Sequence, residues 1–337
     1  MNEIEIRMLY HTHGGDTIRI GFIGPGKVGV SLGRYFTHKG IKLSGYYGTN
    51  LKSTIDAANI TKSKFYDNIQ DIVKESDILF ITTPDDIISI IDREFKKFDL
   101  NNKSICHTSG SLKSNVLCNA KHSGALIYSI HPIFAFSNKN TDIKELETIY
   151  FSIEGDLDNS SLIDNINEGN FQIIKLIKTF GNEYFIRSSE TSSIYHLANV
   201  FVSNLTLSLL NIGTSYLKKL GLNEEEALNA IKPLVQGNID SIVKKGFVNS
   251  LTGPVLRGDI TTIEKHLSVI DKEDKELYRI LSLNLLKLVA LRENDNISKS
   301  ESEQGYYANI ENENILQNLL NNSEKHSEIY EILGGID

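Results

Sequence analysis

Three glycines near the amino end, Gly24, Gly26 and Gly29, follow a short apolar run with the spacing G-x-G-x-x-G. In this setting the first glycine permits a tight turn, the second lets the backbone approach a pyrophosphate, and the third lets the next helix pack on the strand. The helix also offers free N–H groups and the positive end of its dipole to a phosphate. A purely structural turn is the alternative. The pattern favours a dinucleotide-binding turn with contacts from Gly24, Pro25, Gly26, Lys27, Val28 and Gly29.

The choice of dinucleotide depends on the residues after the second predicted strand, residues 41–47. In NAD-specific folds an acidic residue at this point binds the ribose 2′-hydroxyl, and none is present here. Thr49 and Asn50 could instead hydrogen-bond a 2′-phosphate, and Lys52 could neutralise it. We therefore expect NADP (NADPH) as the cofactor, with ordinary loop residues as the alternative.

Two more loops follow predicted strands at the edge where sheets of this class bind ligands. Thr83 and Pro84 come after the apolar run 77–81, and Ser109 and Gly110 come after the next strand. Gly110 would let the chain pass close to a ligand, and Ser109 could donate a hydrogen bond to it. We expect all four to contact the cofactor; a serine-rich turn that caps the following helix is the alternative.

Polar residues interrupt a long apolar segment that begins near residue 190. His196, Asn199, Ser203 and Asn204 lie at i, i+3, i+7 and i+8, so they would share one face of a helix. Burial without partners would cost about 1–3 kcal/mol for each, so they either satisfy one another or line a wet cleft. A histidine that titrates near pH ~6.5 suits proton donation to a developing alkoxide. These four are candidate catalytic residues, with a satisfied core histidine as the alternative.

Two further candidates come from other segments. His131 precedes a proline at the carboxyl end of a predicted strand and should face the nicotinamide side of a cleft, although it could equally cap backbone carbonyls at the turn. Arg257 could bind a substrate carboxylate in bidentate fashion, or pair with an acid elsewhere in the chain. We expect no metal site, because His11 and His13 alone do not form one.

Strand and helix patterns alternate over residues 18–188, which indicates an α/β domain with a doubly wound, mainly parallel sheet of the Rossmann type. Over residues 189–293 the patterns are helical, beginning with a helix of close to 30 residues that is apolar around much of its circumference. This predicts an all-helical substrate and dimerisation domain, and hence a homodimer. Residues 1–17 are predicted to form an N-terminal extension and residues 294–337 a peripheral tail.

The composition limits the cellular compartments and the kinds of binding partner that we expect for this protein. The 337 residues suffice for two domains, and 40% hydrophobic with 23% charged residues is ordinary for a globular protein. A net charge of −8 gives no electrostatic footprint for nucleic acid or an anionic membrane. No stretch approaches the ~18 apolar residues of a membrane span and no signal-peptide pattern is present, so we expect a cytoplasmic protein. The two cysteines indicate neither a metal site nor a disulfide framework.

Several motifs together resemble one known family. Beside the glycine turn they are the segments 107–112, 131–136, 195–204 and 251–259. Over about residues 18–290 the chain resembles the Rossmann-like oxidoreductases with a helical C-terminal domain long labelled as of unknown function. The resemblance implies the architecture of 6-phosphogluconate dehydrogenase, ketopantoate reductase and pyrroline-5-carboxylate reductase relatives, which are usually dimeric. Some members serve as an alternative ketopantoate reductase in pantothenate synthesis, so a small carboxylic acid is the implied substrate.

A second, partial resemblance concerns residues 110–113 followed by 131–133, which are similar to elements of prephenate dehydrogenases in which the serine and histidine sit at the substrate. The chain departs from ordinary ketopantoate reductases, because residues 195–199 stand where those enzymes place a catalytic lysine. Prephenate or arogenate dehydrogenation and reduction of a cyclic imine are therefore the alternatives among enzymes. A dimer that senses NADP without turnover is the alternative outside them.

Overall fold

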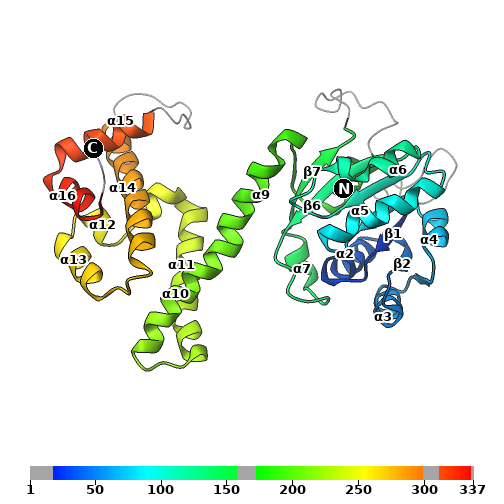
Figure 1. Ribbon diagram of the computed structural model, residues 1–337, viewed down its shortest axis with the longest axis horizontal. Helices are drawn as coiled ribbons and strands as arrows, with labels where there is room; N and C mark the ends of the chain where they lie inside the picture. The colour runs from blue at the N-terminus through cyan, green and yellow to red at the C-terminus, as the bar shows by residue number, and fades with distance from the viewer. Residues whose placement is uncertain (1–17, 158–171, 299–310, 335–337) are drawn as a thin grey trace. The chain divides into compact units, whose positions relative to one another are not determined.

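The computed structural model describes residues 18–157, 172–298 and 311–334. The chain divides into two compact units, Met1–Leu205 and Thr206–Asp337, which follow each other in the colour order of Figure 1. The predicted N-terminal extension, with His11 and His13, lies outside the described residues.

Within the described residues, the first unit is built on an eight-stranded sheet in the order β3-β2-β1-β4-β5-β6-β7-β8. The strands are β1 (Arg19–Ile23), β2 (Lys42–Tyr47), β3 (Lys64–Tyr66), β4 (Ile78–Ile81), β5 (Ser104–His107), β6 (Leu126–Ile133), β7 (Tyr150–Gly155) and β8 (Tyr184–Ile186). Neighbours run parallel except β6 and β7, which are antiparallel. The predicted mainly parallel sheet is confirmed, and the short β3 is added because three residues are too few to show a period.

Helices cover both faces of this sheet (Figure 1). The described helices of the first unit are α2 (Lys27–His38), α3 (Leu51–Thr61), α4 (Ile69–Glu75), α5 (Asp85–Glu94), α6 (Cys118–His122), α7 (Ile143–Leu146), α8 (Gln172–Phe180) and α9 (Ser192–Val200), with 3-10 turns η1 (Phe95–Lys97), η2 (Ser114–Leu117) and η4 (Ser189–Thr191); α9 leads away from the sheet. Successive residues of each strand point to opposite faces of the sheet and so contribute to two different hydrophobic clusters. Phe22 and Phe80 pack with Phe36 of α2, whereas Ile81 packs with Ile88 of α5 on the opposite face. Two covered faces explain why the strands read as nearly continuous apolar runs.

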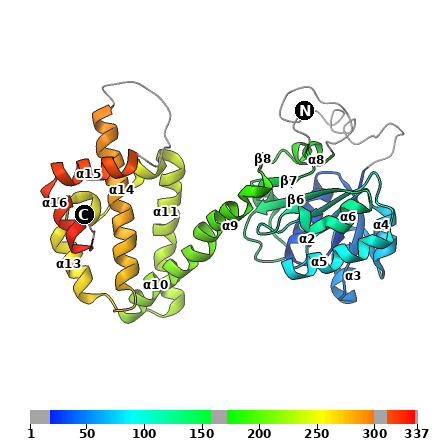
Figure 2. The ribbon, with the colours of Figure 1, turned by 45° about the horizontal axis from the view of Figure 1, so that its top comes forward.

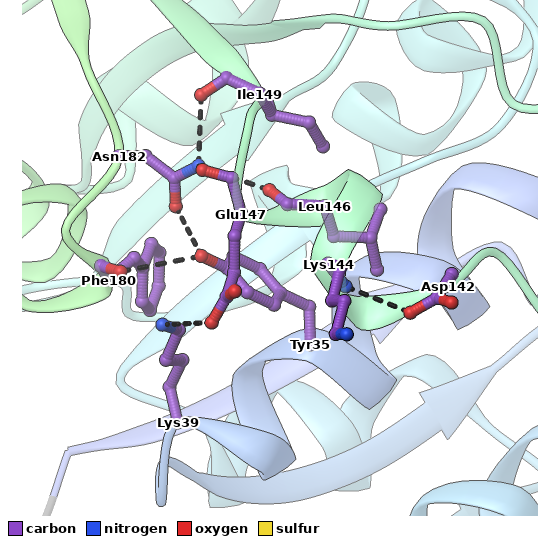
Figure 3. A network of polar contacts seen from close by, with 9 residues as sticks. All are labelled: Tyr35, Lys39, Asp142, Lys144, Leu146, Glu147, Ile149, Phe180 and Asn182. Carbon is purple, nitrogen blue, oxygen red and sulfur yellow. Dashed lines mark hydrogen bonds and ion pairs between the residues drawn. The ribbon is translucent and has the colours of Figure 1, made fainter.

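A polar network ties the outer strands to α2 (Figure 3). The hydroxyl of Tyr35 donates to Oδ1 of Asn182 over 2.6 Å. The amide nitrogen of Asn182 donates to the carbonyl oxygens of Leu146, Glu147 and Ile149 at 3.1, 3.2 and 2.9 Å. Burial raises the pKa of Tyr35 to about 12, so its hydroxyl stays a neutral donor. The network holds the segments that lead into β7 and β8 against one helix.

Helices make up the described part of the second unit, as predicted. They are α10 (Thr206–Lys219), α11 (Glu224–Ser250), α12 (Pro254–Arg257), α13 (Ile260–Val269), α14 (Lys275–Ser298), α15 (Glu311–Asn322) and α16 (Glu324–Ile332). Figure 2 shows α10, α11 and α14 side by side. The core of this unit forms around α12, α13 and α14.

The described helices of the predicted peripheral tail, α15 and α16, contribute to a hydrophobic core instead. Leu319 of α15 and Ile329 of α16 are 7% and 0% exposed, and they share one hydrophobic cluster with Ile263 and Val289. The composition of this segment is rich in Asn and Glu, which conceals the single apolar face of each short helix. The two last helices therefore complete the core of the second unit.

The long apolar segment forms one helical run, Ser189–Lys219, in which a π-helical turn, η5 (Phe201–Leu205), separates α9 from α10. Contrary to expectation, this run is long and apolar enough to cross a membrane when judged by length and composition alone. Only 6% of its most apolar window is buried against the rest of the described chain. Those two properties do not separate a membrane segment from a helix that packs on a second subunit.

Candidate functional site

The glycine turn lies at the carboxyl end of β1, between the ends of β2 and β4. Gly24 has φ 109°, a conformation that favours glycine. Its N–H donates to the carbonyl oxygen of Tyr47 over 2.8 Å, and its own carbonyl oxygen accepts from Oγ1 of Thr82 over 2.7 Å. The two neighbouring strands therefore hold the turn in place.

Gly26 and Gly29 differ in whether the fold has space for a side chain at that position. A Cβ on Gly29 would lie 2.4 Å from Oγ1 of Thr82 and 2.5 Å from the carbonyl oxygen of Gly24, so α2 can approach the turn this closely only with glycine at that position. A Cβ on Gly26 would meet nothing nearer than the Thr82 carbonyl oxygen at 3.7 Å. The fold itself does not require Gly26, which leaves the open side of its backbone for a ligand.

The first turn of α2 is suited to an anion. Gly26 is its N-cap and makes no side-chain cap hydrogen bond, and the turn contains no acidic residue. The first N–H groups of a helix have no intrahelical partner and carry the positive end of the dipole. Pro25 is half-buried while Gly26 and Lys27 are exposed. This donor set fits a pyrophosphate.

The residues predicted to bind a 2′-phosphate lie together before and within the first turn of α3. Asn50 is the N-cap of this helix, and its Oδ1 accepts from the backbone N–H of Ser53 over 2.9 Å. Thr49, Asn50 and Lys52 are all exposed, and the first turn contains no acid. Asn50 therefore has a structural role, and phosphate binding by the three residues stays a prediction.

The loops after β4 and β5 share the carboxylate of Asp85, the first residue of α5. Its Oδ2 accepts from the hydroxyls of Ser109 and Ser111 at 2.8 and 2.5 Å. The Ser109 hydroxyl is thus already engaged, whereas Oγ1 of Thr83 is buried and has no partner within the described part of the chain. Pro84, the N-cap of α5, lies between these groups in sequence.

His131, on β6, lies between an aromatic ring and a glycine. The hydroxyl of Tyr195 lies 2.5 Å from its Nδ1, and the two rings meet at 81° with centroids 5.6 Å apart. On another side, a Cβ on Gly110 would come within 2.9 Å of Nε2, so glycine is required where the imidazole packs. Burial and the positive charges of Arg187 and His196 lower the pKa of His131 to about 4, which keeps the ring neutral at pH 7.

Tyr195 and Arg187 were not among the predicted site residues. Tyr195 lies in the first turn of α9, and the Arg187 guanidinium lies over its ring at 4.9 Å from the centroid. The only sequence signal for Tyr195 was its place in the motif 195–204. Arg187 gave none, because its contacts depend on which strands become neighbours.

That the four polar residues of the long helix share one face stays a prediction. His196 and Asn199 lie in α9, whereas Ser203 and Asn204 lie in the π-helical turn Phe201–Leu205, which has a wider repeat than an α-helix. Asn199 donates to the carbonyl oxygen of Tyr195 over 2.8 Å, while His196, Ser203 and Asn204 are exposed. In this group, His196 acts on the pKa of His131.

Arg257 belongs to the second unit, at the end of α12. Its side chain is 62% exposed, and its guanidinium lies 3.7 Å from Oδ2 of Asp259. Asp259 is the N-cap of α13 and accepts from both the N–H and the hydroxyl of Thr262. A role for Arg257 as a carboxylate anchor stays a prediction.

Comparisons with known proteins match both halves of the chain. One family model, a Rossmann-like domain, matches residues 14–132, and another, a domain of unknown function (DUF2520), matches residues 150–285. A solved protein from Thermotoga maritima is 25% identical, with a TM-score of 0.57, covering 84% of this chain and 100% of that one. A search of curated proteins finds no match.

Two more solved structures share the fold at lower identity. The pyrroline carboxylate reductase of Plasmodium falciparum, solved with NADP bound, is 16% identical with a TM-score of 0.54, covering 82% of this chain and 95% of that one. The reductive aminase of Aspergillus terreus, in complex with NADPH and ethyl-5-oxohexanoate, is 10% identical with a TM-score of 0.52, covering 87% and 97%.

The sheet order, the glycine turn and the helical second unit define a Rossmann-type protein with the fold of the NADP-dependent oxidoreductases. Within that class, the chain joins a Rossmann-like domain to a DUF2520 domain, the two models that match its two halves. The family resemblance seen in the motifs is therefore confirmed.

Proposed function

We propose that this protein is an NADPH-dependent oxidoreductase that reduces a small 2-oxo acid, with ketopantoate (2-dehydropantoate) as the specific substrate and pantoate as the product. One observation carries the proposal: the uncapped start of α2 and the His131–Tyr195 pair lie at the same edge of one sheet. The strands β1 and β6 are separated by β4 and β5. Three spacings of ~4.8 Å give roughly 14 Å, a span suited to an extended dinucleotide.

The residues at this edge fit the parts of NADP in order. The N–H groups at the start of α2 would hold the pyrophosphate, and Thr49, Asn50 and Lys52 would receive the 2′-phosphate. The loops that carry Thr83, Pro84, Ser109 and Gly110 lie between β1 and β6 in the sheet. When bound, the reduced cofactor supplies a hydride.

The chain must then provide a proton and favour an anionic substrate. His131 and Tyr195 are the proposed groups for the proton. Arg187 lies behind Tyr195, and its positive charge acts on His131, so a buried cation lies close to the pair. This charge favours a 2-oxo acid over a neutral ketone.

Reduction of a cyclic imine is the second candidate. It is supported by the fold that this chain shares with a pyrroline carboxylate reductase. The two substrates differ in the proton that they need. A 2-oxo acid needs a proton on oxygen after reduction, whereas a protonated imine brings its own proton.

The test is a substrate panel with the purified full-length protein, monitored by the absorbance of the reduced nicotinamide. The panel holds ketopantoate, other branched 2-oxo acids and pyrroline-5-carboxylate, with NADH replacing NADPH as a control. Turnover of ketopantoate with NADPH supports the proposal, and selective turnover of the imine replaces it with the second candidate. A third outcome is that the protein binds NADPH, reduces no compound of the panel and does not oxidise prephenate with NADP. That outcome would leave the NADP-sensing dimer as the function.

We also propose that the protein is a cytoplasmic homodimer through its helices. In the second unit, α10 and α11 expose Leu207, Leu234, Val243 and Phe247, which are 65%, 66%, 83% and 65% exposed in the single chain. Exposed apolar residues of this number are typical of a subunit interface. Light scattering checks the mass, and extraction with salt or detergent distinguishes a dimer from a membrane-bound protein.

A further inference from the structure

A buried guanidinium lies behind Tyr195 and bonds only hydroxyl groups. Arg187 is 7% exposed. Its Nε donates to Ser152 over 2.9 Å, Nη1 to Ser192 over 2.5 Å and Nη2 to Ser129 over 3.1 Å. All three serines are themselves buried. The side chain therefore reaches from the end of β8 across β7 to β6.

The charge of Arg187 has no ion-pair partner within the described residues. The buried acid on the neighbouring strand, Glu154, is committed elsewhere, because its two oxygens accept from the N–H and the hydroxyl of Ser114, each over 2.7 Å. A buried guanidinium without a carboxylate is costly, and neutral hydroxyls return only part of that cost. The fold nevertheless places this charge against the ring of Tyr195, at 4.9 Å from the centroid.

The hydrogen bond between Tyr195 and His131 determines where the protons are. A neutral imidazole has one donor and one acceptor nitrogen. The Tyr195 hydroxyl lies 2.5 Å from Nδ1; in the tautomer that we assign, Nδ1 accepts from this hydroxyl and the ring carries its own proton on Nε2, the nitrogen beside Gly110. Because the pKa of His131 is lowered to about 4, an imidazolium is scarce at pH 7. A second proton must therefore reach the ring from its neighbour.

We propose that Arg187, Tyr195 and His131 form a proton relay that serves the proposed reduction, and this inference rests on that function. After hydride addition to carbon, the electron pair of the C=O π bond resides on oxygen. That oxygen takes the proton from Nε2 of His131, and Nδ1 takes the hydroxyl proton of Tyr195. The imidazole ends neutral with its proton on the other nitrogen. The phenolate remains beside Arg187 until a proton from solvent restores it.

In this scheme His131 is the catalytic residue, because it alone meets the substrate oxygen, and Tyr195 and Arg187 act through it. The charged and titratable groups that act on His131 are Arg187, His196, Asp85 and His107. Burial raises the pKa of Tyr195, and the hydrogen bond with Ser152 and the charge of Arg187 oppose that rise. The relay therefore predicts a dependence on pH that a purely structural role would not produce.

The first experiment compares single-turnover reduction by NADPH in wild type and Tyr195→Phe across pH 5–9. We expect the variant to lose about 100-fold at pH 7 with unchanged NADPH affinity, and to recover in part at acid pH, where His131 itself becomes protonated. Tyr150→Phe is the matched control, because Tyr150 is an exposed tyrosine on β7 whose ring meets Phe185, as the Tyr195 ring does. A Tyr195→Phe enzyme with the wild-type rate and pH profile overturns the relay.

A second measurement needs no substrate and so separates failure of the relay from failure of the proposed function. The Nδ1 and Nε2 shifts of His131 in ¹⁵N spectra should show the Nε2-protonated form in wild type and a mixture of tautomers in Tyr195→Phe. Arg187→Gln should raise the apparent pKa of Tyr195 in an ultraviolet titration, and Arg187→Lys should restore it in part. If Arg187→Gln does not fold, the proposal is tested with the pKa of Tyr195 in Arg187→Lys and the tautomer of His131 in Tyr195→Phe. Two results contradict the proposal: a His131 that carries its proton on Nδ1, or an apparent pKa of Tyr195 that is the same in wild type and in Arg187→Gln.

Discussion

The Tyr195 hydroxyl lies 2.5 Å from Nδ1 of His131, and this contact joins the first turn of α9 to β6. The same histidine is held in its neutral form, because burial and the charge of Arg187 lower its pKa to about 4. The surroundings of His131 therefore have a consequence for stability as well as for chemistry.

We expect the first unit to lose stability as the pH falls from about 6.5 towards 4. The folded pKa of His131 is lowered to about 4, below the ordinary value of ~6.5, so the unfolded chain binds more protons in this window. Stability due to neutral His131 is complete above pH ~6.5 and is lost as the pH falls. Between pH 7 and 5 the loss should be roughly 1–2 kcal/mol.

Denaturation at pH 7 and pH 5 measures this effect, and His131→Gln should reduce the difference between the two. Buried His107, whose pKa is also lowered by burial, contributes with the same sign and remains in the variant. His38→Gln, at an exposed position in α2, is the control and should leave the difference unchanged. An equal pH dependence in wild type and His131→Gln would show that His131 is not the group that titrates.

The glycines of the turn allow fold and cofactor binding to be separated. Gly29→Ala would place a Cβ 2.4 Å from Thr82 Oγ1, so we expect a destabilisation of about 1–3 kcal/mol or more and loss of NADPH binding. In Gly26→Ala the nearest atom to the new Cβ is the Thr82 carbonyl oxygen at 3.7 Å. The protein without cofactor should therefore melt like wild type, while NADPH affinity falls at least about tenfold. Thermal melts and cofactor titration measure both. Unchanged affinity in Gly26→Ala would argue against a pyrophosphate at this turn.

Local pattern was enough to predict the turn, the sheet class and the helical second unit, because each depends on residues close in sequence. Of the three proton-relay residues, His131 was predicted from its place at the end of a strand, whereas Tyr195 and Arg187 were not. Arg187 meets Ser129 and Ser152 only because β7 lies between β6 and β8, antiparallel to β6 and parallel to β8, a pairing that alternation of strands and helices does not reveal. The π-helical turn that separates His196 from Ser203 was not predictable either, since such a turn leaves no mark in apolar periodicity.

The network around Asn182 should be a large local source of stability in the first unit. Asn182→Ala leaves three carbonyl oxygens and the Tyr35 hydroxyl without this partner, in a site where Asn182 is 5% exposed and Tyr35 fully buried. We expect a loss of roughly 3 kcal/mol, against about 1 kcal/mol for Tyr35→Phe. Urea denaturation measures both, with Asn59→Ala, at an exposed position of α3, as the control. Equal stability of Asn182→Ala and wild type would show that water replaces the lost bonds.

Preference for NADPH should depend on Lys52. This lysine is exposed in the first turn of α3, where no acid competes for it. Lys52→Ala should weaken NADPH about tenfold and leave NADH unchanged, because only the 2′-phosphate carries the charge that the lysine would meet. Lys42→Ala is the control, since Lys42 is exposed at the amino end of β2, the opposite edge of the sheet. The difference between the cofactors should shrink as salt is added. If Lys52→Ala weakens both cofactors equally, the lysine contributes general charge, and the 2′-phosphate must be recognised by Thr49, Asn50 or the backbone around them.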